Sequence, residues 1–218
     1  MSRYALREVG IKAALIDDLF ETGAVDDASV IVNEMLVPGW RRRADLVHAN
    51  GQLVAYEIKS EADSLARLPG QIDSFTRWFE GVAVVVAPKH VQNVLASIED
   101  GVGVFTASVE EGAVSIRRVR PIRLASLGRE AALRHMSTAD LGRVAKSQGL
   151  TSRACGHRQT LEVIVSELPL ASLRIAAIEA IKRRHSRTYD RFLSARSCVG
   201  TSIAMASLRK SAWGSYSS

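Results

Sequence analysis

A run of five apolar residues, Val82 to Val86, constrains the fold of this chain more than any other feature. The run is uncharged, shows no alternation of apolar and polar residues, and lies between two segments with helical patterns. A strand of this kind is buried on both faces, which is typical of a central strand covered by helices on each side. The pattern therefore favours an α/β fold with this run at the centre of the sheet.

The segments around this run predict the rest of the sheet and its helices. Periodicity and strand-forming residues predict helices over 4–20, 62–79 and 90–98, and strands over 29–36, 44–49, 53–59, 102–105 and 113–116. Asn50-Gly51 lies between two of these strands and is typical of a hairpin turn. The order α-β-β-β-α-β-α-β-β predicts a mixed central sheet flanked by helices.

The pattern changes after Pro121, where helical segments replace strands. We expect helices over 126–136, 137–149, 158–168 and 171–187, with a shorter one over 202–209. Ser137 followed by Asp140 predicts a capping box at the start of the second helix. The sequence thus predicts an α/β domain over 1–120, followed by a small basic all-α domain over 121–218.

The charge of the chain is divided unevenly between these two parts. Residues 1–116 hold 10 Lys or Arg against 17 Asp or Glu, a balance of −7, whereas residues 117–218 hold 19 against 6, a balance of +13. Such a split favours a polyanionic partner held mainly by the second half, although basic helices can also serve solubility alone. With two cysteines and no apolar segment long enough to span a bilayer, we expect a cytoplasmic protein without a membrane partner.

Three charged residues interrupt the apolar hairpin: Asp45 on its first strand, and Glu57 and Lys59 on its second. Burying a charge without a partner is costly, so their presence indicates a function. Two carboxylates can ligate Mg²⁺ or Mn²⁺, a lysine can steady a phosphate or an attacking hydroxide, and the Ile58 carbonyl could add a ligand. An exposed ion pair on an edge strand, or an aspartate that caps a turn, remains open as an alternative.

The geometry of the turn decides whether this site can exist. A two-residue turn at Asn50-Gly51 would pair Asp45 with Tyr56 and place Asp45 and Glu57 on opposite faces. A three-residue turn or a bulge at Gly51 places both carboxylates on one face. We therefore predict the wider turn.

These residues resemble the PD-(D/E)XK nuclease superfamily. The matching positions are Asp45 and Glu57-Ile58-Lys59, with a helix before and a helix after them. The wider pattern, which includes Asn33-Glu34, Arg42-Arg43-Ala44-Asp45, Asp63-Ser64-Leu65, Arg67-Leu68 and Gln71, looks like a bacterial and phage branch akin to the MmcB-like DNA-repair endonucleases. The resemblance covers residues 5–106 and implies a restriction-endonuclease-like core, with Asp45 and Glu57 as metal ligands and Lys59 as the catalytic lysine.

The resemblance also implies supporting residues. Glu8 corresponds to an acidic residue that some members supply from the preceding helix, Gln71 to a glutamine on the following helix, and Glu34 is a candidate third ligand; each could instead be a solvated residue. Two positions depart from the pattern: Ala44 stands where the nominal proline would be, and Phe75 stands where tyrosine is expected.

Several cations could hold a nucleic-acid backbone. The candidates are Arg41, Arg42, Arg43, Arg67, Lys146, Arg153 and Arg158. Residues 141–168 resemble the short helical DNA-binding modules called SAP domains, although a plain helical cap on the core would give a similar pattern.

The function expected from the sequence is metal-dependent hydrolysis of DNA, with Mg²⁺ or Mn²⁺ as cofactor, in DNA repair, recombination or phage and mobile-element biology. RNA as substrate and a homodimer as the active form are left open. The alternative is a nucleic-acid-binding or adaptor protein that keeps the fold without the activity.

Overall fold

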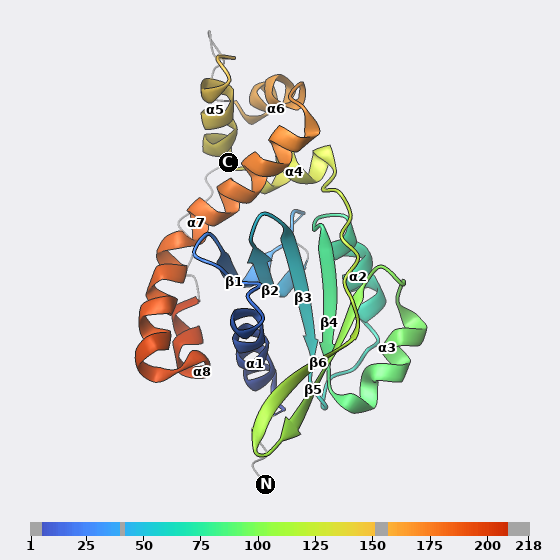
Figure 1. Cartoon of the computed structure of the whole chain (residues 1–218). Helices are drawn as coiled ribbons and strands as arrows, with labels where there is room; N and C mark the ends of the chain where they lie inside the picture. The colour runs from blue at the N-terminus through green and yellow to red at the C-terminus, as the bar shows by residue number, and fades with distance from the viewer. Residues whose placement is uncertain (1–5, 40–41, 151–156, 209–218) are drawn as a thin grey trace.

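The structure, a computed structural model, describes residues 6–39, 42–150 and 157–208 (Figure 1). Its centre is a six-stranded sheet with the strand order β1-β2-β3-β4-β5-β6. The strands are β1 (Val30–Leu36), β2 (Arg43–Ala49), β3 (Leu53–Lys59), β4 (Gly81–Val86), β5 (Gly103–Glu110) and β6 (Ala113–Arg120). Each predicted strand is present, and β5 and β6 are longer than expected.

The sheet is mixed, as predicted. Strand β3 pairs antiparallel with β2 and parallel with β4, and β4 also pairs parallel with β5; the outer pairs β1–β2 and β5–β6 are antiparallel. All six residues of β4 are buried. Its continuous apolar sequence is explained by this position, because a strand flanked by parallel neighbours and covered on both faces has no side exposed to water.

Helices surround the sheet and continue beyond it. They are α1 (Glu8–Glu21), α2 (Leu68–Thr76), η1 (Pro88–His90), α3 (Val91–Ser97), α4 (Arg129–His135), α5 (Thr138–Ser147), α6 (Arg158–Ser166), α7 (Leu170–Val199), α8 (Thr201–Ala204) and η2 (Met205–Leu208). The order of elements through β6 is the predicted one, so the α/β fold class is confirmed. Helices α4, α5 and α6 gather at one end of the sheet (Figure 1).

The end of α7 differs from the sequence prediction. A helix over 171–187 was expected to stop after its cationic run, yet α7 continues to Val199. Tyr189 and Phe192 extend its apolar side and are buried. Their burial against the main core stabilises the extra turns, which local sequence pattern alone did not indicate. In Figure 1, α7 runs past β1, and α8 lies close to α1.

Two clusters of buried side chains hold the chain together. The larger joins the sheet to α1, α2, α7, α8 and η2, and the smaller joins α4, α5, α6 and the first half of α7. Helix α7 therefore contributes to both clusters, and the division into domains at residue 120 remains a prediction. None of the helices in the described ranges combines the length and the apolar composition required to cross a membrane.

Candidate functional site

The turn between β2 and β3 has the width that the site requires. Ala49 pairs with Leu53, which leaves three residues in the turn, and Gly51 has a φ of +60°, a conformation that glycine adopts without steric cost. The pairing of Leu46 with Tyr56 places Asp45 opposite Glu57 at the next position. The predicted wider turn is confirmed, and the two acidic residues share one face of the sheet.

Glu57 is the buried centre of this group and is 2% exposed. Its Oε1 accepts hydrogen bonds from Lys59 Nζ at 2.7 Å and from Gln71 Nε2, which belongs to α2, at 2.5 Å. Its Oε2 is buried and has no hydrogen-bond partner within residues 6–39, 42–150 and 157–208. Because buried carboxylate oxygens are costly to leave unsatisfied, the free oxygen indicates a position for a ligand.

Asp45 lies beside this group and is fixed by the backbone. Its Oδ2 accepts a 2.8 Å hydrogen bond from the N–H of Ile58. Burial and, after it, the negative charge of Glu57 raise the pKa of Asp45 to about 7. The pKa of Glu57 is also raised, mainly by burial, although Lys59 opposes the shift. Two neighbouring carboxylates repel each other when both are ionised, so the pair binds a proton or a cation more readily than an isolated carboxylate does.

A second acidic pair lies near the first and is held by a lysine that the sequence reasoning missed. Lys12 of α1 is 3% exposed, and its Nζ lies 2.7 Å from Glu8 and 3.8 Å from Glu34. Lys12 lies within the otherwise apolar buried stripe of α1, and a charged residue in such a stripe could have identified it from sequence. The two expected supporting acids, Glu8 and Glu34, are thus brought together by a buried ammonium group.

Glu34 also has an unusual backbone conformation. Its φ is +54°, in the left-handed region that residues with a side chain rarely adopt. Asn33 pairs with Leu46 and Met35 with Ala44, so Glu34 lies opposite Asp45 across β1 and β2. Strained residues of this kind are often found where a side chain must be aimed at a functional site.

The residues at this site fit a divalent cation in part. Asp45 and Glu57 offer carboxylate oxygens as ligands. Among the described residues no group is bonded to Oε2 of Glu57, so this oxygen could coordinate a metal ion. Within the described ranges, no group of three or more His, Cys, Asp or Glu side chains is close enough to hold a metal ion. A cation would therefore be held by these two carboxylates together with backbone oxygen or water, which is common for Mg²⁺.

The cations expected to bind nucleic acid have different environments. Arg41 and Arg153 lie outside the described residues. Arg43 pairs with Glu34 at 3.2 Å, and the Arg42 guanidinium lies against Gly70 at the start of α2. Arg67, which precedes α2, and Lys146, in the last turn of α5, are exposed, as is Arg43. Arg158 instead donates to the carbonyls of Met136 and Leu133, so it ties α6 to α4.

A cluster around Asp140 gathers arginines that the sequence analysis did not single out. The predicted capping box is confirmed, since Asp140 accepts from the N–H and the hydroxyl of Ser137. Asp140 also accepts from Arg143 and Arg183, each at 2.7 Å, and from Arg184 at 3.0 Å. Burial alone would raise the pKa of Asp140, but these hydrogen bonds hold it well below its usual range. Arg183 and Arg184 belong to the run Lys182-Arg183-Arg184 in the middle of α7.

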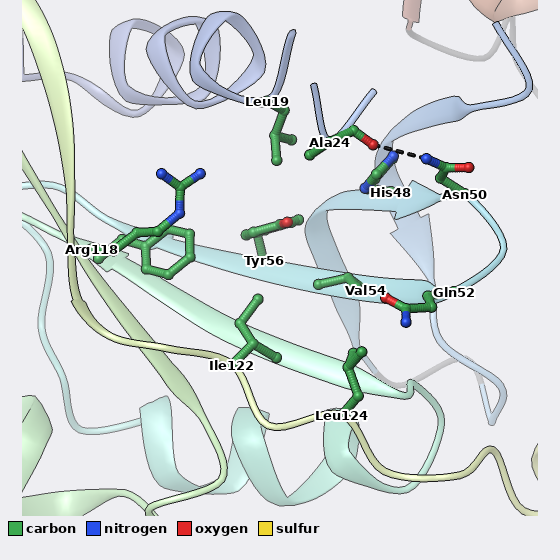
Figure 2. A pocket seen from close by; sticks show the side chains of 11 residues that line it. Leu19, Ala24, His48, Asn50, Gln52, Val54, Tyr56, Arg118, Ile122 and Leu124 are labelled. Carbon is green, nitrogen blue, oxygen red and sulfur yellow. Dashed lines mark hydrogen bonds between the residues drawn. The ribbon is translucent and has the colours of Figure 1, made fainter. Parts of the chain in front are cut away.

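A pocket of about 300 Å³ lies on the other face of β3, where Tyr56 points (Figure 2). Because successive strand residues point to opposite faces, this pocket is separated from Glu57 by the sheet itself. Its walls come from α1, the β2–β3 turn and the segment after β6. No sequence motif indicated it.

Comparisons with known proteins find a sequence family, a relative and a solved structure that are similar to this chain. Residues 1–210 match the sequence model of a family described as Bacteriophage P4 protein cII. Protein cII of Enterobacteria phage P4 is 40% identical over 190 residues, which cover 87% of this chain and 72% of that protein. A solved structure of the SPO1766 protein of unknown function from Silicibacter pomeroyi is similar over 56% of this chain and 75% of that chain, at 18% identity and a TM-score of 0.41.

Proposed function

This chain belongs to the bacteriophage P4 protein cII family, and we propose that it is a Mg²⁺- or Mn²⁺-dependent nuclease that hydrolyses phosphodiester bonds of DNA. The observation that carries the proposal is the half-buried Asp45 opposite the buried Glu57. One Glu57 oxygen has no hydrogen-bond partner among the described residues, and Lys59 is bonded to the other. A pair of desolvated carboxylates beside an ammonium group has no evident value for stability, because buried ion pairs contribute little. It does suit the cleavage of a phosphodiester.

Each residue would have a distinct role in this reaction. Asp45 and Glu57 would hold the cation, and Gln71 would keep the Glu57 carboxylate in place through its hydrogen bond to Oε1. A bound divalent cation would supply a water of lowered pKa and neutralise charge on the phosphate. Lys59, two residues beyond Glu57 on the same face, would donate to the phosphate oxygens or to the attacking hydroxide.

The wider architecture supports a polyanionic substrate. The mixed sheet with flanking helices is compatible with a restriction-endonuclease-like core over residues 1–120, and the cations after residue 120 would hold the nucleic-acid backbone. Arg118 and Arg120, however, belong to β6 and pair with Asp18 and Asp100 of the core. The exposed Arg67 and Lys146 are the better candidates for backbone contact.

A cleavage assay tests this proposal. The full chain is incubated with single-stranded, duplex and branched DNA in the presence of Mn²⁺, Mg²⁺ or EDTA. We expect Glu57→Gln and Lys59→Gln each to reduce the metal-dependent rate by at least about 100-fold. Glu61→Gln is the matched control, because Glu61 is exposed and follows the same strand. Equal cleavage by wild type and both site variants would remove these residues from the mechanism.

One observation favours a second candidate function, a nucleic-acid-binding or adaptor protein without cleavage. The ammonium groups of Lys12 and Lys59 already neutralise much of the negative charge of the site. If these lysines replaced the cation permanently, the chain would bind DNA in a salt-sensitive way, and neither Mn²⁺ nor Mg²⁺ would produce cleavage. The same assay, combined with a binding titration at two salt concentrations, separates the two functions.

A further inference from the structure

The pocket on the Tyr56 face of the sheet has an apolar, aromatic interior. Tyr56 and Phe105 lie on neighbouring parts of its floor, with their ring centroids 6.3 Å apart. Leu19, Ile122 and Leu124 approach from the sides (Figure 2). A volume of about 300 Å³ is at the small end of the range for ligand pockets, so one ring system fits and a larger cofactor does not.

A polar group inside this pocket lacks a partner. Tyr56 is 3% exposed, and within the part of the chain that the structure describes no group forms a hydrogen bond with its hydroxyl. Among the side chains drawn in Figure 2, the one hydrogen bond joins Asn50 to the Ala24 carbonyl at 2.9 Å. A tyrosine hydroxyl that lines a pocket and has no partner from the protein is available to a bound molecule.

The other polar groups of the pocket carry no net charge. The Arg118 guanidinium is paired with Asp18 at 2.7 Å and lies 5.4 Å from the centre of the Phe105 ring. Burial lowers the pKa of His48 to about 4, so its imidazole is neutral at pH 7. Gln52, at the rim, adds an amide that can both donate and accept. The pocket therefore suits an uncharged molecule with hydrogen-bonding edges.

The shape of the pocket is fixed before any ligand binds. The segment after β6 crosses the sheet where β4 and β5 carry Gly81 and Gly103, and a Cβ at either position would come within 3 Å of Ile122. The same segment is tied down by hydrogen bonds from Arg123 N–H to the Gly101 carbonyl at 3.0 Å and from Ala125 N–H to the Glu80 carbonyl at 2.7 Å. A wall held in this way is preorganised, which reduces the entropic cost of binding.

We propose that this pocket binds an uncharged heteroaromatic ring of nucleobase size, which lies against Tyr56 and Phe105 and accepts or donates a hydrogen bond at the Tyr56 hydroxyl. Every nucleobase has an apolar face and a polar edge, and stacking on aromatic side chains is a common way of holding one. The ring could belong to a free nucleoside or to an unstacked base of a strand. The site is distinct from Asp45 and Glu57, and the proposal does not depend on cleavage.

Binding of nucleosides, followed by NMR of the ¹⁵N-labelled full chain, tests the proposal. Adenosine, guanosine, cytidine and thymidine are titrated to 10 mM, and benzyl alcohol serves as an aromatic ring without a nucleobase edge. We expect at least one nucleoside to shift amide signals of residues 19–24, 48–56 and 118–124. Tyr56→Phe removes the hydroxyl alone and should weaken that affinity by about 3- to 10-fold.

A matched control comes from a second tyrosine. Tyr189 of α7 is 4% exposed and does not line this pocket, and its buried hydroxyl has no hydrogen-bond partner among the residues that the structure describes. Tyr189→Phe should leave nucleoside affinity unchanged, whereas Gln52→Trp at the exposed rim should block it. Absence of pocket shifts with every nucleoside and oligonucleotide, unchanged affinity in Tyr56→Phe, or equal binding of benzyl alcohol would each overturn the proposal.

The source of the ring is decided by a short oligonucleotide. If oligothymidylate shifts the pocket amides and free nucleosides do not, the ligand is a base of a strand. If nucleosides alone produce the shifts, the ligand is a free nucleoside or nucleotide. Oligonucleotide binding that shifts only signals of the basic helices, together with no pocket shift from any nucleoside, contradicts the proposal.

Discussion

The backbone N–H of Ile58 donates a 2.8 Å hydrogen bond to the carboxylate of Asp45, and this contact joins the two strands of the candidate site. It holds Asp45 on the side of the sheet where Glu57 lies, although burial and the charge of Glu57 both disfavour an ionised aspartate there. The fold thus maintains a pair of acidic groups at a cost in stability, a feature that is common at functional sites.

Replacing Asp45 by Asn should stabilise the protein above pH 7. The pKa of Asp45 is about 7 in the folded state and about 4 in the unfolded state, so the folded state binds more protons between these values. Wild type should therefore lose stability as the pH rises from about 4 to about 7. We expect Asp45→Asn to gain on the order of 2 kcal/mol at pH 8. Denaturant titrations without metal would measure the difference in free energy of unfolding between the variant and wild type, which should shrink towards pH 4. A difference that does not change with pH would contradict this account.

The charge of Lys59 should offset the cost of keeping the buried Glu57 carboxylate ionised. Removing one partner of a buried ion pair leaves an uncompensated charge, which costs about 3 kcal/mol. We therefore expect Lys59→Met to lower the free energy of unfolding by about this amount at pH 8. The double variant Glu57→Gln with Lys59→Met should recover much of the loss, as a thermodynamic cycle of the four proteins would measure. Additive losses would show that the pair does not interact as the 2.7 Å contact indicates.

At Glu34 the energetic cost of the backbone conformation can be measured separately from the effect of the carboxylate charge. Glu34→Gly and Glu34→Ala both remove the carboxylate, but glycine adopts a φ of +54° without penalty and alanine does not. We expect the glycine variant to be more stable than the alanine variant by about 1 kcal/mol in urea denaturation. At a strand position with ordinary backbone angles, the alanine variant would be the more stable of the two.

Mild acid should destabilise the fold through His135. This side chain is 2% exposed, and its Nε2 lies 2.7 Å from the Trp78 carbonyl. Burial lowers its pKa to about 4 in the folded state, so the unfolded state binds more protons between about 4 and 6.5. Stability should be complete above pH 6.5 and fall by up to about 3 kcal/mol as the pH approaches 4. His135→Gln should show a smaller fall in parallel thermal denaturation, and an identical pH profile would exclude His135 as its source.

Asp140 should be the most important acidic residue of the helical part. Asp140→Ala removes the capping box and leaves Arg143, Arg183 and Arg184 without their shared partner. We expect a loss of about 3 kcal/mol in the free energy of unfolding. Asp73→Ala is the control, since Asp73 and its partner Arg77 are exposed and should contribute less than about 0.5 kcal/mol. Comparable losses in the two variants would contradict a central role for Asp140.

The amino-acid sequence was sufficient to predict the order of the sheet elements, the central place of β4 and the capping box at Ser137. Each of these depends on residues close together in the chain, because strand and helix periods, turn chemistry and capping are local properties. The three charges on the apolar hairpin also identified Asp45, Glu57 and Lys59 before their positions were known, since an apolar strand does not carry such residues without a partner.

The distant residues that complete these groups became evident from the folded chain alone. Lys12 contacts Glu34, Glu57 is bonded to Gln71, and Asp140 is shared by arginines from α5 and α7. The length of α7 and the pocket beside Tyr56 likewise depend on packing between elements far apart in the chain. Burial, charge pairing and desolvation are set by the neighbours in space, and these are defined only when the sheet and its helices have come together.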